Sequence, residues 1–192
     1  FTLERVNKAP ASFDPQKLVA FQTRWMNNLD LKKKVAMVLP YLQKAGLVAD
    51  PPPCAVADRL SKIMQAAGDR IKVAGDVLQF DELFVEAENL VVDQEAFQKR
   101  LASDEQAISA LRDFRTILAA ADSLTHDTLE PQLKQFVEQR GIKLGVCISA
   151  LRIAVTGKSN GLGIFDYFEI LGKEETLERI DRCLTRLDGM QT

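Results

Sequence analysis

Apolar residues recur every three or four positions along most of this 192-residue chain. That spacing gathers them on one face of a helix, whereas a half-buried strand would alternate apolar and polar residues. No alternating run of useful length is present. Hydrophobic residues make up 46% of the chain and charged residues 27%, which is typical of a globular protein with a buried core. The sequence therefore predicts an all-α fold, a multi-helix bundle of roughly ten helices joined by short loops.

Residues with strong capping preferences mark several helix ends. Asp14-Pro15 combines an N-cap acid with proline at the first helical position. Asp30 precedes a second helix that Gly46 ends. Three further N-caps are predicted at Asp93, Ser103 and Thr128.

The charges are distributed unevenly, although the formal net charge is only −2. Residues 1–48 and 139–192 carry more lysine and arginine than acid, while residues 49–138 hold most of the carboxylates. The stiff connector Asp50-Pro51-Pro52-Pro53 adds a boundary near the first of these changes. We therefore predict three segments, 1–48, 49–138 and 139–192. An anionic partner is expected to contact patches near the two ends.

The stretch from Lys143 to Glu174 gives the most specific prediction. Its first helix carries an apolar stripe formed by Leu144, Ile148, Leu151 and Val155. Gly157 ends that helix, and the glycine-rich bend SNGLG leads into a second helix that stops at Gly172. No acid occurs between Glu138 and Asp166, whereas four bases lie in or beside this segment: Arg140, Lys143, Arg152 and Lys158. Free backbone N–H groups at a helix start, with unopposed cations nearby, predict a phosphate-binding corner that faces RNA.

These residues resemble the C-terminal anticodon-binding region of bacterial-type glutamyl-tRNA synthetases, which are class I aminoacyl-tRNA synthetases. The resemblance is carried by Leu151-Arg152, Thr156-Gly157, Gly163-Ile164-Phe165 and Leu171-Gly172-Lys173-Glu174. The opening FTLERVNKAPASFDPQKL is similar to the segment after that family's catalytic signature loop. The resemblance implies an α-helical cage of two helical subdomains, 49–138 and 139–192, that binds the anticodon. It also implies that residues 1–48 contact the tRNA stem, and that the chain is a piece of a longer ligase.

The resemblance implies three groups of contact residues. Those for anticodon bases are Gly161, Leu162, Gly163, Ile164, Ala67 and Arg70; those for phosphates are Arg152, Lys158, Lys173 and Lys143; those for the stem are Arg5, Lys8 and Lys17. Leu162 departs from the proline that is common in the family. Ala67 aligns with an arginine that rejects glutamine tRNA in some members, so acceptance of that tRNA stays open.

The resemblance also implies what this chain leaves to the rest of the ligase. The single histidine, His126, and the lack of a Lys-Met-Ser-Lys-Ser type loop predict that no catalytic residue and no cofactor belong to this chain. ATP and Mg²⁺ would be bound by the missing catalytic domain, which is itself an expected partner. The other expected partner is tRNA for glutamate, with glutamine tRNA as the open alternative. The protein is expected to be a cytoplasmic monomer without DNA or membrane contact, since no apolar run approaches the roughly 20 residues of a membrane helix.

The cysteines do not suggest a metal site or a disulfide framework. Cys54, Cys147 and Cys183 are odd in number and widely spaced, without a CxxC pair. We expect buried or half-buried free thiols.

Other functions and motifs were weighed against this interpretation. A helical protein–protein interaction module stays open, as does a small enzyme that uses carboxylates between Asp76 and Asp113. Thr156-Gly157-Lys158-Ser159 fails as a P-loop because Arg152 stands where that motif needs a glycine. Aromatic residues such as Trp25 are expected in the core, whereas Phe165 and Tyr167 flank the bend and are candidates for base stacking.

Overall fold

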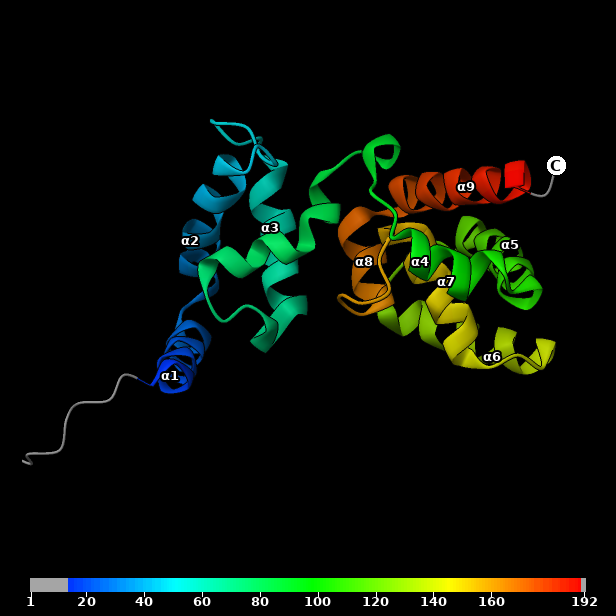
Figure 1. Ribbon diagram of the computed structural model, residues 1–192, viewed down its shortest axis with the longest axis horizontal. Helices are drawn as coiled ribbons and strands as arrows, with labels where there is room; N and C mark the ends of the chain where they lie inside the picture. Colours follow the sequence, from blue (N-terminus) through cyan, green and yellow to red (C-terminus); the bar gives the residue numbers. More distant parts are fainter. Residues whose placement is uncertain (1–13, 191–192) are drawn as a thin grey trace, which may run out of the picture.

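The computed structural model describes residues 14–190, and every regular element in that range is a helix (Figure 1). The all-α prediction is confirmed. The α-helices are α1 (Pro15–Asn28), α2 (Leu31–Lys44), α3 (Ala55–Ala67), α4 (Gln94–Phe97), α5 (Glu105–Ala120), α6 (His126–Arg140), α7 (Leu144–Thr156), α8 (Ile164–Leu171) and α9 (Lys173–Met190). Shorter 3-10 segments are η2 (Gly68–Arg70), η3 (Ala74–Phe84) and η4 (Ala87–Asn89), and a π-helical turn, η5 (Gln98–Ala102), continues α4.

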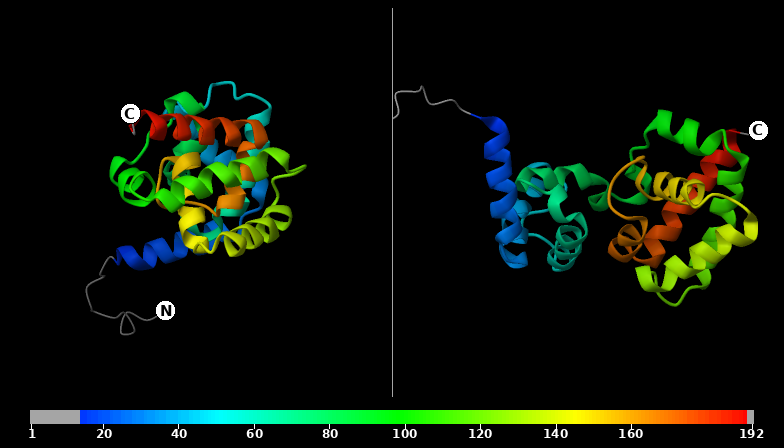
Figure 2. Two further views of the ribbon diagram at one scale, coloured as in Figure 1. Left: turned by 90° about the vertical axis from the view of Figure 1, so that its right-hand side faces the viewer. Right: turned by 90° about the horizontal axis from the view of Figure 1, so that it is seen from below.

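The helices form two lobes. The N-terminal lobe contains α1, α2, α3 and η3, and the C-terminal lobe contains α4 to α9 (Figure 1). Seen from below in Figure 2, α1 lies at the outer edge of the N-terminal lobe, while α8 and the loop before it lie on the side of the C-terminal lobe that faces it. Residues 85–93 connect the lobes. The predicted boundaries at 48/49 and 138/139 both fall inside a lobe, because α2 packs on α3 and α6 packs on α7.

Capping explains where several helices begin. Three predicted N-caps are confirmed at Asp14, Asp30 and Asp93, whose carboxylates accept backbone N–H groups of the first turn. The predictions at Ser103 and Thr128 are wrong. Asp104 caps α5 instead, since Ser103 closes the π-helical turn before it, and Thr128 lies inside α6, which begins after Thr125.

A continuous core runs through both lobes. In the C-terminal lobe, Phe114 of α5 is fully buried and its ring centroid lies 5.5 Å from that of Phe136. In the N-terminal lobe, Leu83 is fully buried and Phe80 nearly so. Phe80 also interrupts η3 with φ −109° and ψ 33°, so this stretch is a pair of short helical turns around a packed aromatic side chain.

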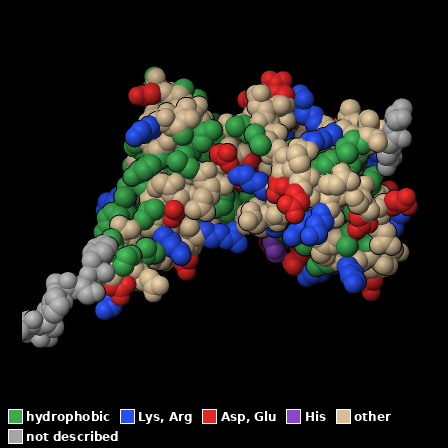
Figure 3. Space-filling view, viewed as in Figure 1, with side chains coloured by type: hydrophobic (Ala, Val, Ile, Leu, Met, Phe, Trp, Pro, Cys, Tyr) green, Lys and Arg blue, Asp and Glu red, His purple; other side chains and the backbone are tan. Residues whose placement is uncertain are grey.

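Helix α1 presents an apolar face to solvent. Leu18, Phe21 and Trp25 share one face, as their spacing predicts, but they are 45%, 68% and 54% exposed. The expectation that Trp25 lies in the core is wrong, because Met26 is the only residue of α1 that is buried. Figure 3 shows hydrophobic side chains gathered over the N-terminal lobe, on the side of the molecule where α1 lies. Among the described residues, no helix is long and apolar enough to cross a membrane.

The cysteines differ in exposure, which gives a simple prediction for alkylation. Burial raises the pKa of the Cys147 thiol to about 12, and burial also raises that of Cys183 to about 12. Cys54 is exposed, in contrast to the expectation for it. Because the thiolate is the reactive form, iodoacetamide at pH 8 is expected to modify Cys54 alone in the native protein, as counted by intact mass. Rapid addition of two or three labels would contradict this.

Candidate nucleic-acid interface

The glycine bend, residues 157–163, joins α7 to α8 as predicted. Gly157 ends α7 with φ +69°, in the left-handed region, and its N–H donates to Ile153 O at 2.9 Å. α8 begins directly after Gly163. The apolar stripe of α7 anchors the first side of the bend, since Leu151 and Val155 are fully buried. The bend is therefore held between two packed helices.

Three backbone N–H groups of the glycine bend are satisfied by neighbouring side chains. They donate as follows: Lys158 to Thr156 Oγ1 at 3.1 Å, Leu162 to Tyr167 Oη at 3.3 Å and Gly163 to Asp166 Oδ2 at 3.0 Å. The prediction of a row of free N–H groups is wrong at these three positions. Asn160 and Gly163 are the exposed residues of the bend, so a nucleotide would reach it there.

Two guanidinium groups bind the carbonyl side of the glycine bend. Arg70 Nη1, from η2, donates to Gly161 O at 2.7 Å, and Arg152 Nη1, from α7, donates to Leu162 O. Burial lowers the pKa of Arg152, and the neighbouring Arg70 cation adds to this effect. Arg152 nevertheless remains charged, because arginine is not deprotonated in proteins. Neither forms an ion pair with a carboxylate in the part of the chain that the structure describes. Two neighbouring cations without an acid attract an anionic ligand.

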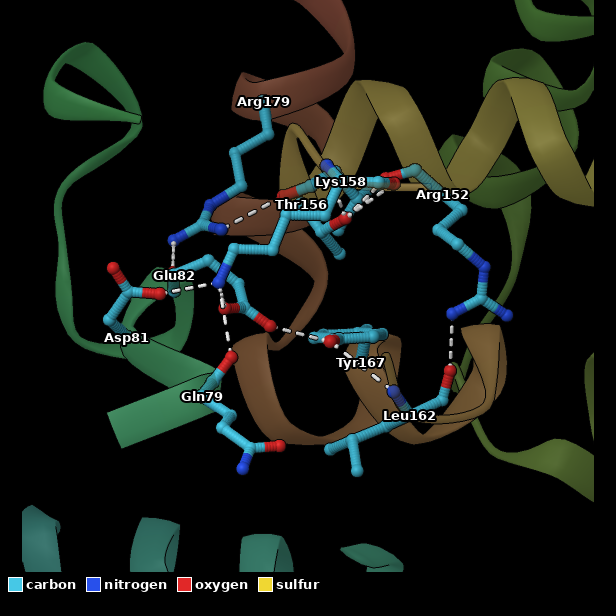
Figure 4. A network of polar contacts seen from close by, with 10 residues as sticks. Gln79, Asp81, Glu82, Arg152, Thr156, Lys158, Leu162, Tyr167 and Arg179 are labelled. Atoms are coloured by element: carbon cyan, nitrogen blue, oxygen red, sulfur yellow. Dashed lines mark hydrogen bonds and ion pairs between the residues drawn. The ribbon is translucent and has the colours of Figure 1, made fainter. Parts of the chain in front are cut away.

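Lys158 does not fit the prediction of an unopposed cation. Its Nζ donates to Glu82 Oε2 at 2.6 Å, to Gln79 O at 3.1 Å and to the carboxylate of Asp81 (Figure 4). Burial acts to lower the pKa of Lys158, but the hydrogen bonds to Asp81 and Glu82 outweigh it and raise that pKa. The two acids lie in η3, far away in sequence, so the acid-free stretch around Lys158 gave no sign of them. The predicted contact of Lys158 with phosphate stays a prediction, and these two carboxylate contacts do not favour it.

The other two lysines predicted to bind phosphate differ from each other. Lys173 Nζ donates to Ala121 O at 2.8 Å and so ties the start of α9 to the end of α5. Lys143 is exposed at the N-cap position of α7, at the opposite end of that helix from the glycine bend. The structure therefore does not bring either lysine together with Arg70 and Arg152.

Three residues predicted to contact bases have buried side chains. Leu162 is fully buried, and Ala67 and Ile164 are each 3% exposed. Leu162 and Ile164 can offer only backbone atoms to a ligand. Ala67 lies in the core of the N-terminal lobe, whereas Arg70, three residues later, reaches the glycine bend.

The predicted stem contacts lie apart from the glycine bend. Lys17 is exposed on α1, where its Nζ lies 4.0 Å from Asp14. Arg5 and Lys8 lie outside the described residues. α1 is at the outer edge of the N-terminal lobe (Figure 2), so a ligand that contacts both regions must be long.

The aromatic residues that flank the bend are not available for stacking. Tyr167 is fully buried and Phe165 is 8% exposed, with its ring edge-on to His126 at a centroid distance of 5.0 Å. The prediction of a stacking platform at these two residues is wrong, because both face the core from α8.

Sequence reasoning missed a buried polar network behind the glycine bend. Arg179 of α9, 1% exposed, donates to the carbonyl oxygens of Val155, Glu82 and Val85 at 2.8 to 2.9 Å and to Glu175 Oε1 at 2.7 Å. Figure 4 shows its guanidinium group beside Glu82. The only sequence signal is position: Arg179 lies beside Ile180 on the apolar side of α9, where a charged residue needs partners.

The acidic residues of the middle segment are engaged in structural contacts or face solvent. Among residues 14–190, no group of three or more His, Cys, Asp or Glu side chains could hold a metal ion. The carboxylates between Asp76 and Asp113 cap helices, form ion pairs or face solvent. The arrangement instead offers paired cations and backbone carbonyls at an exposed bend.

Comparison with known proteins defines the class. The family model described as "Anticodon binding domain" matches residues 33–184, and the chain belongs to this family.

The relatives that the chain resembles narrow this class. It is 31% identical over 187 residues to the glutamate–tRNA ligase of Roseiflexus sp. (strain RS-1), covering 97% of this chain and 37% of that protein. It is 30% identical over 196 residues to glutamate–tRNA ligase 2 of Thermoanaerobacter pseudethanolicus, covering 100% of this chain and 39% of that protein. The chain therefore matches the C-terminal anticodon-binding part of glutamate–tRNA ligases, spans about 37% of their length and does not include their catalytic domain.

A solved structure agrees on the fold. The crystal structure of a glutamate tRNA ligase from Elizabethkingia meningosepticum, in complex with its amino acid, superimposes with a TM-score of 0.80 at 21% identity. The superposition covers 97% of this chain and 35% of the other.

Proposed function

We propose that this chain binds tRNA for glutamate at its anticodon and along its inner stem, as the tRNA-binding part of a ligase that attaches glutamate to tRNA. The observation that carries this proposal is the pair Arg70 and Arg152, which converge on one exposed bend without a carboxylate partner among the described residues. Phosphate contacts of this kind position an RNA strand, and backbone groups of the bend then contact unpaired bases. Such a protein works where tRNA is charged, in the cytoplasm.

The exposed face of α1 has a separate role in this proposal. Leu18, Phe21 and Trp25 form an apolar surface at the outer edge of the N-terminal lobe, away from the glycine bend. The relatives extend well beyond the matched part, since this chain covers 37% of their length. We propose that the catalytic domain of the ligase packs on α1. We also propose that this catalytic domain binds ATP and Mg²⁺, since the described residues offer no metal site. In this proposal α1 is the surface that contacts another domain of the same monomer, and the glycine bend is the surface that contacts RNA.

The decisive experiment measures binding to three RNAs across a salt series. These are glutamate tRNA, glutamine tRNA and glutamate tRNA with a substituted anticodon. Glutamate tRNA is expected to bind tighter than the substituted form at every salt concentration. The result with glutamine tRNA shows whether the chain rejects this tRNA although Ala67 stands at the position that aligns with the discriminating arginine. Equal affinity for the glutamate tRNA and its substituted form would defeat the proposal.

Replacing Arg152 with glutamine tests the phosphate contact. We expect weaker binding to every tRNA and a slope of log affinity against log salt that is smaller by about one unit, because one phosphate neutralisation is lost. Arg152→Lys is expected to keep that slope, since it keeps the charge. Arg100→Gln, at an exposed residue of the π-helical turn after α4, serves as a control for the loss of a positive charge. Unchanged affinity and slope for Arg152→Gln would contradict the assignment.

A further inference from the structure

The two ends of the glycine bend are anchored to a single buried carboxylate. Glu82, 3% exposed, accepts from Tyr167 Oη at 2.5 Å through Oε1 and from Lys158 Nζ at 2.6 Å through Oε2. Tyr167 in turn accepts the N–H of Leu162. Figure 4 shows Tyr167 between Glu82 and Leu162, with Lys158 reaching the same carboxylate from the opposite end of the bend.

This carboxylate belongs to the N-terminal lobe, whereas the glycine bend belongs to the C-terminal lobe. Glu82 lies in η3, and the bend precedes α8. Burial raises the pKa of Tyr167, so its hydroxyl keeps its proton and remains the donor to Glu82. Both oxygens of Glu82 are therefore occupied by donors from across the lobe boundary, and the group is not free to act as a base or a metal ligand.

Tyr167 also limits the shape that the bend can take. Gly161 has φ +146°, and a Cβ built there would lie 2.2 Å from Tyr167 Oη. The hydroxyl thus sits directly against Gly161 while it accepts the N–H of the next residue. The carbonyl oxygens of Gly161 and Leu162 are those that Arg70 and Arg152 bind. A change at the Tyr167 hydroxyl would therefore move the atoms on which both cations depend.

A buried ion pair of this kind is a poor source of stability, because apolar side chains of the same volume would often serve as well. What the contacts of Glu82 do provide is one defined conformation for an otherwise flexible glycine-rich segment. We propose that Tyr167 and Glu82 are positioning residues for base recognition, which fix the glycine bend in the conformation that distinguishes the anticodon. This inference rests on the proposed function and assigns specificity, rather than overall affinity, to the buried network.

The test is Tyr167→Phe, which removes one oxygen and leaves the ring in place. We expect the preference for glutamate tRNA over its anticodon-substituted form to fall on the order of tenfold, since recognition geometry must be held closely. The slope of log affinity against log salt is expected to stay unchanged, because no phosphate contact is removed. Tyr41→Phe, at an exposed tyrosine of α2, is the matched control. Circular dichroism and thermal unfolding of both variants identify any loss of folded protein.

The outcomes separate this inference from the proposed function. If the unaltered protein prefers glutamate tRNA and Tyr167→Phe keeps that preference, the positioning role is refuted and tRNA binding stands. An equal loss of affinity for both RNAs, with a smaller salt slope, also refutes it. If the unaltered protein has no preference, both proposals fail. If Tyr167→Phe does not fold, Glu82→Gln replaces it. The amide keeps an acceptor for Tyr167 but loses the charge that holds Lys158. A retained preference for glutamate tRNA in that variant overturns the inference.

Discussion

Replacing Arg179 with methionine is expected to lower the free energy of unfolding by about 3–5 kcal/mol. Arg179 is 1% exposed and holds three backbone carbonyl groups from two parts of the chain, Val155 in α7 and Glu82 and Val85 at the end of η3. Methionine fills a similar volume but donates no hydrogen bond, so these buried carbonyl groups lose their partner. Glu175 would keep its ion pair with Arg59, whose Nη2 lies 3.1 Å from Glu175 Oε2. The lost contact with this carboxylate is therefore not the main source of the destabilisation.

Urea unfolding followed by circular dichroism measures this change, with Arg182→Met as the matched control. Arg182 lies in the same helix, is exposed and pairs with Glu178 at 3.2 Å and Glu88 at 3.9 Å. Exposed ion pairs contribute little, so its loss is expected to cost less than about 1 kcal/mol. Similar losses for the two variants would show that the buried carbonyl contacts of Arg179 do not stabilise the fold.

Replacing Gly157 with alanine is expected to cost about 2–5 kcal/mol of unfolding free energy. Two effects add at this position. The φ of +69° is unfavourable for a residue with a side chain, and a Cβ would lie 2.3 Å from the backbone oxygen of Val91. The segment that contains Val91 is held there by a hydrogen bond from Asp93 N to Gly157 O at 2.8 Å, so it cannot move away freely.

Gly141→Ala separates these two effects. Gly141 ends α6 with a similar φ of +64°, and a Cβ built there would have no atom within 4 Å. Only the conformational cost, about 1–2 kcal/mol, is expected at that position. The difference between the two variants in thermal or urea unfolding reports the contact with Val91. Equal destabilisation of the two variants would mean that residues 85–93 move away from the added Cβ without a measurable loss of unfolding free energy.

The features that follow from local sequence were the predictable ones. Helical spacing gave the all-α fold, and Asp14, Asp30 and Asp93 cap helices because a short carboxylate satisfies N–H groups two or three residues away. The glycine bend was predictable for the same reason, since Gly157 needs no distant partner to end α7. Ser103 and Thr128 were mistaken for caps because several residues with similar preference lie side by side there, and propensity alone does not choose between them.

The contacts between the lobes could not be predicted in this way. Lys158 stands in a stretch without acids, yet folding brings Asp81 and Glu82 to its ammonium group. Arg179 lies on the apolar side of α9, which indicates that it needs partners, but the sequence does not show that its carbonyl partners come from α7 and the end of η3. Such pairings depend on how the lobes meet, which neither periodicity nor capping specifies. The resemblance to a known family found the region of the candidate site, but it did not indicate which cations are already paired.

The contacts across the lobe boundary limit where the chain can be divided or recombined. Glu82 and Tyr167 lie on opposite sides of the crossing at residues 85–93, so neither half of the chain contains the glycine bend together with its support. A protein divided at that crossing, by proteolysis or by gene fission, would yield two helical halves in which the glycine bend is separated from the carboxylate that supports it. Exchange of either half between related anticodon-binding domains would succeed only where both carry a matching acid and hydroxyl.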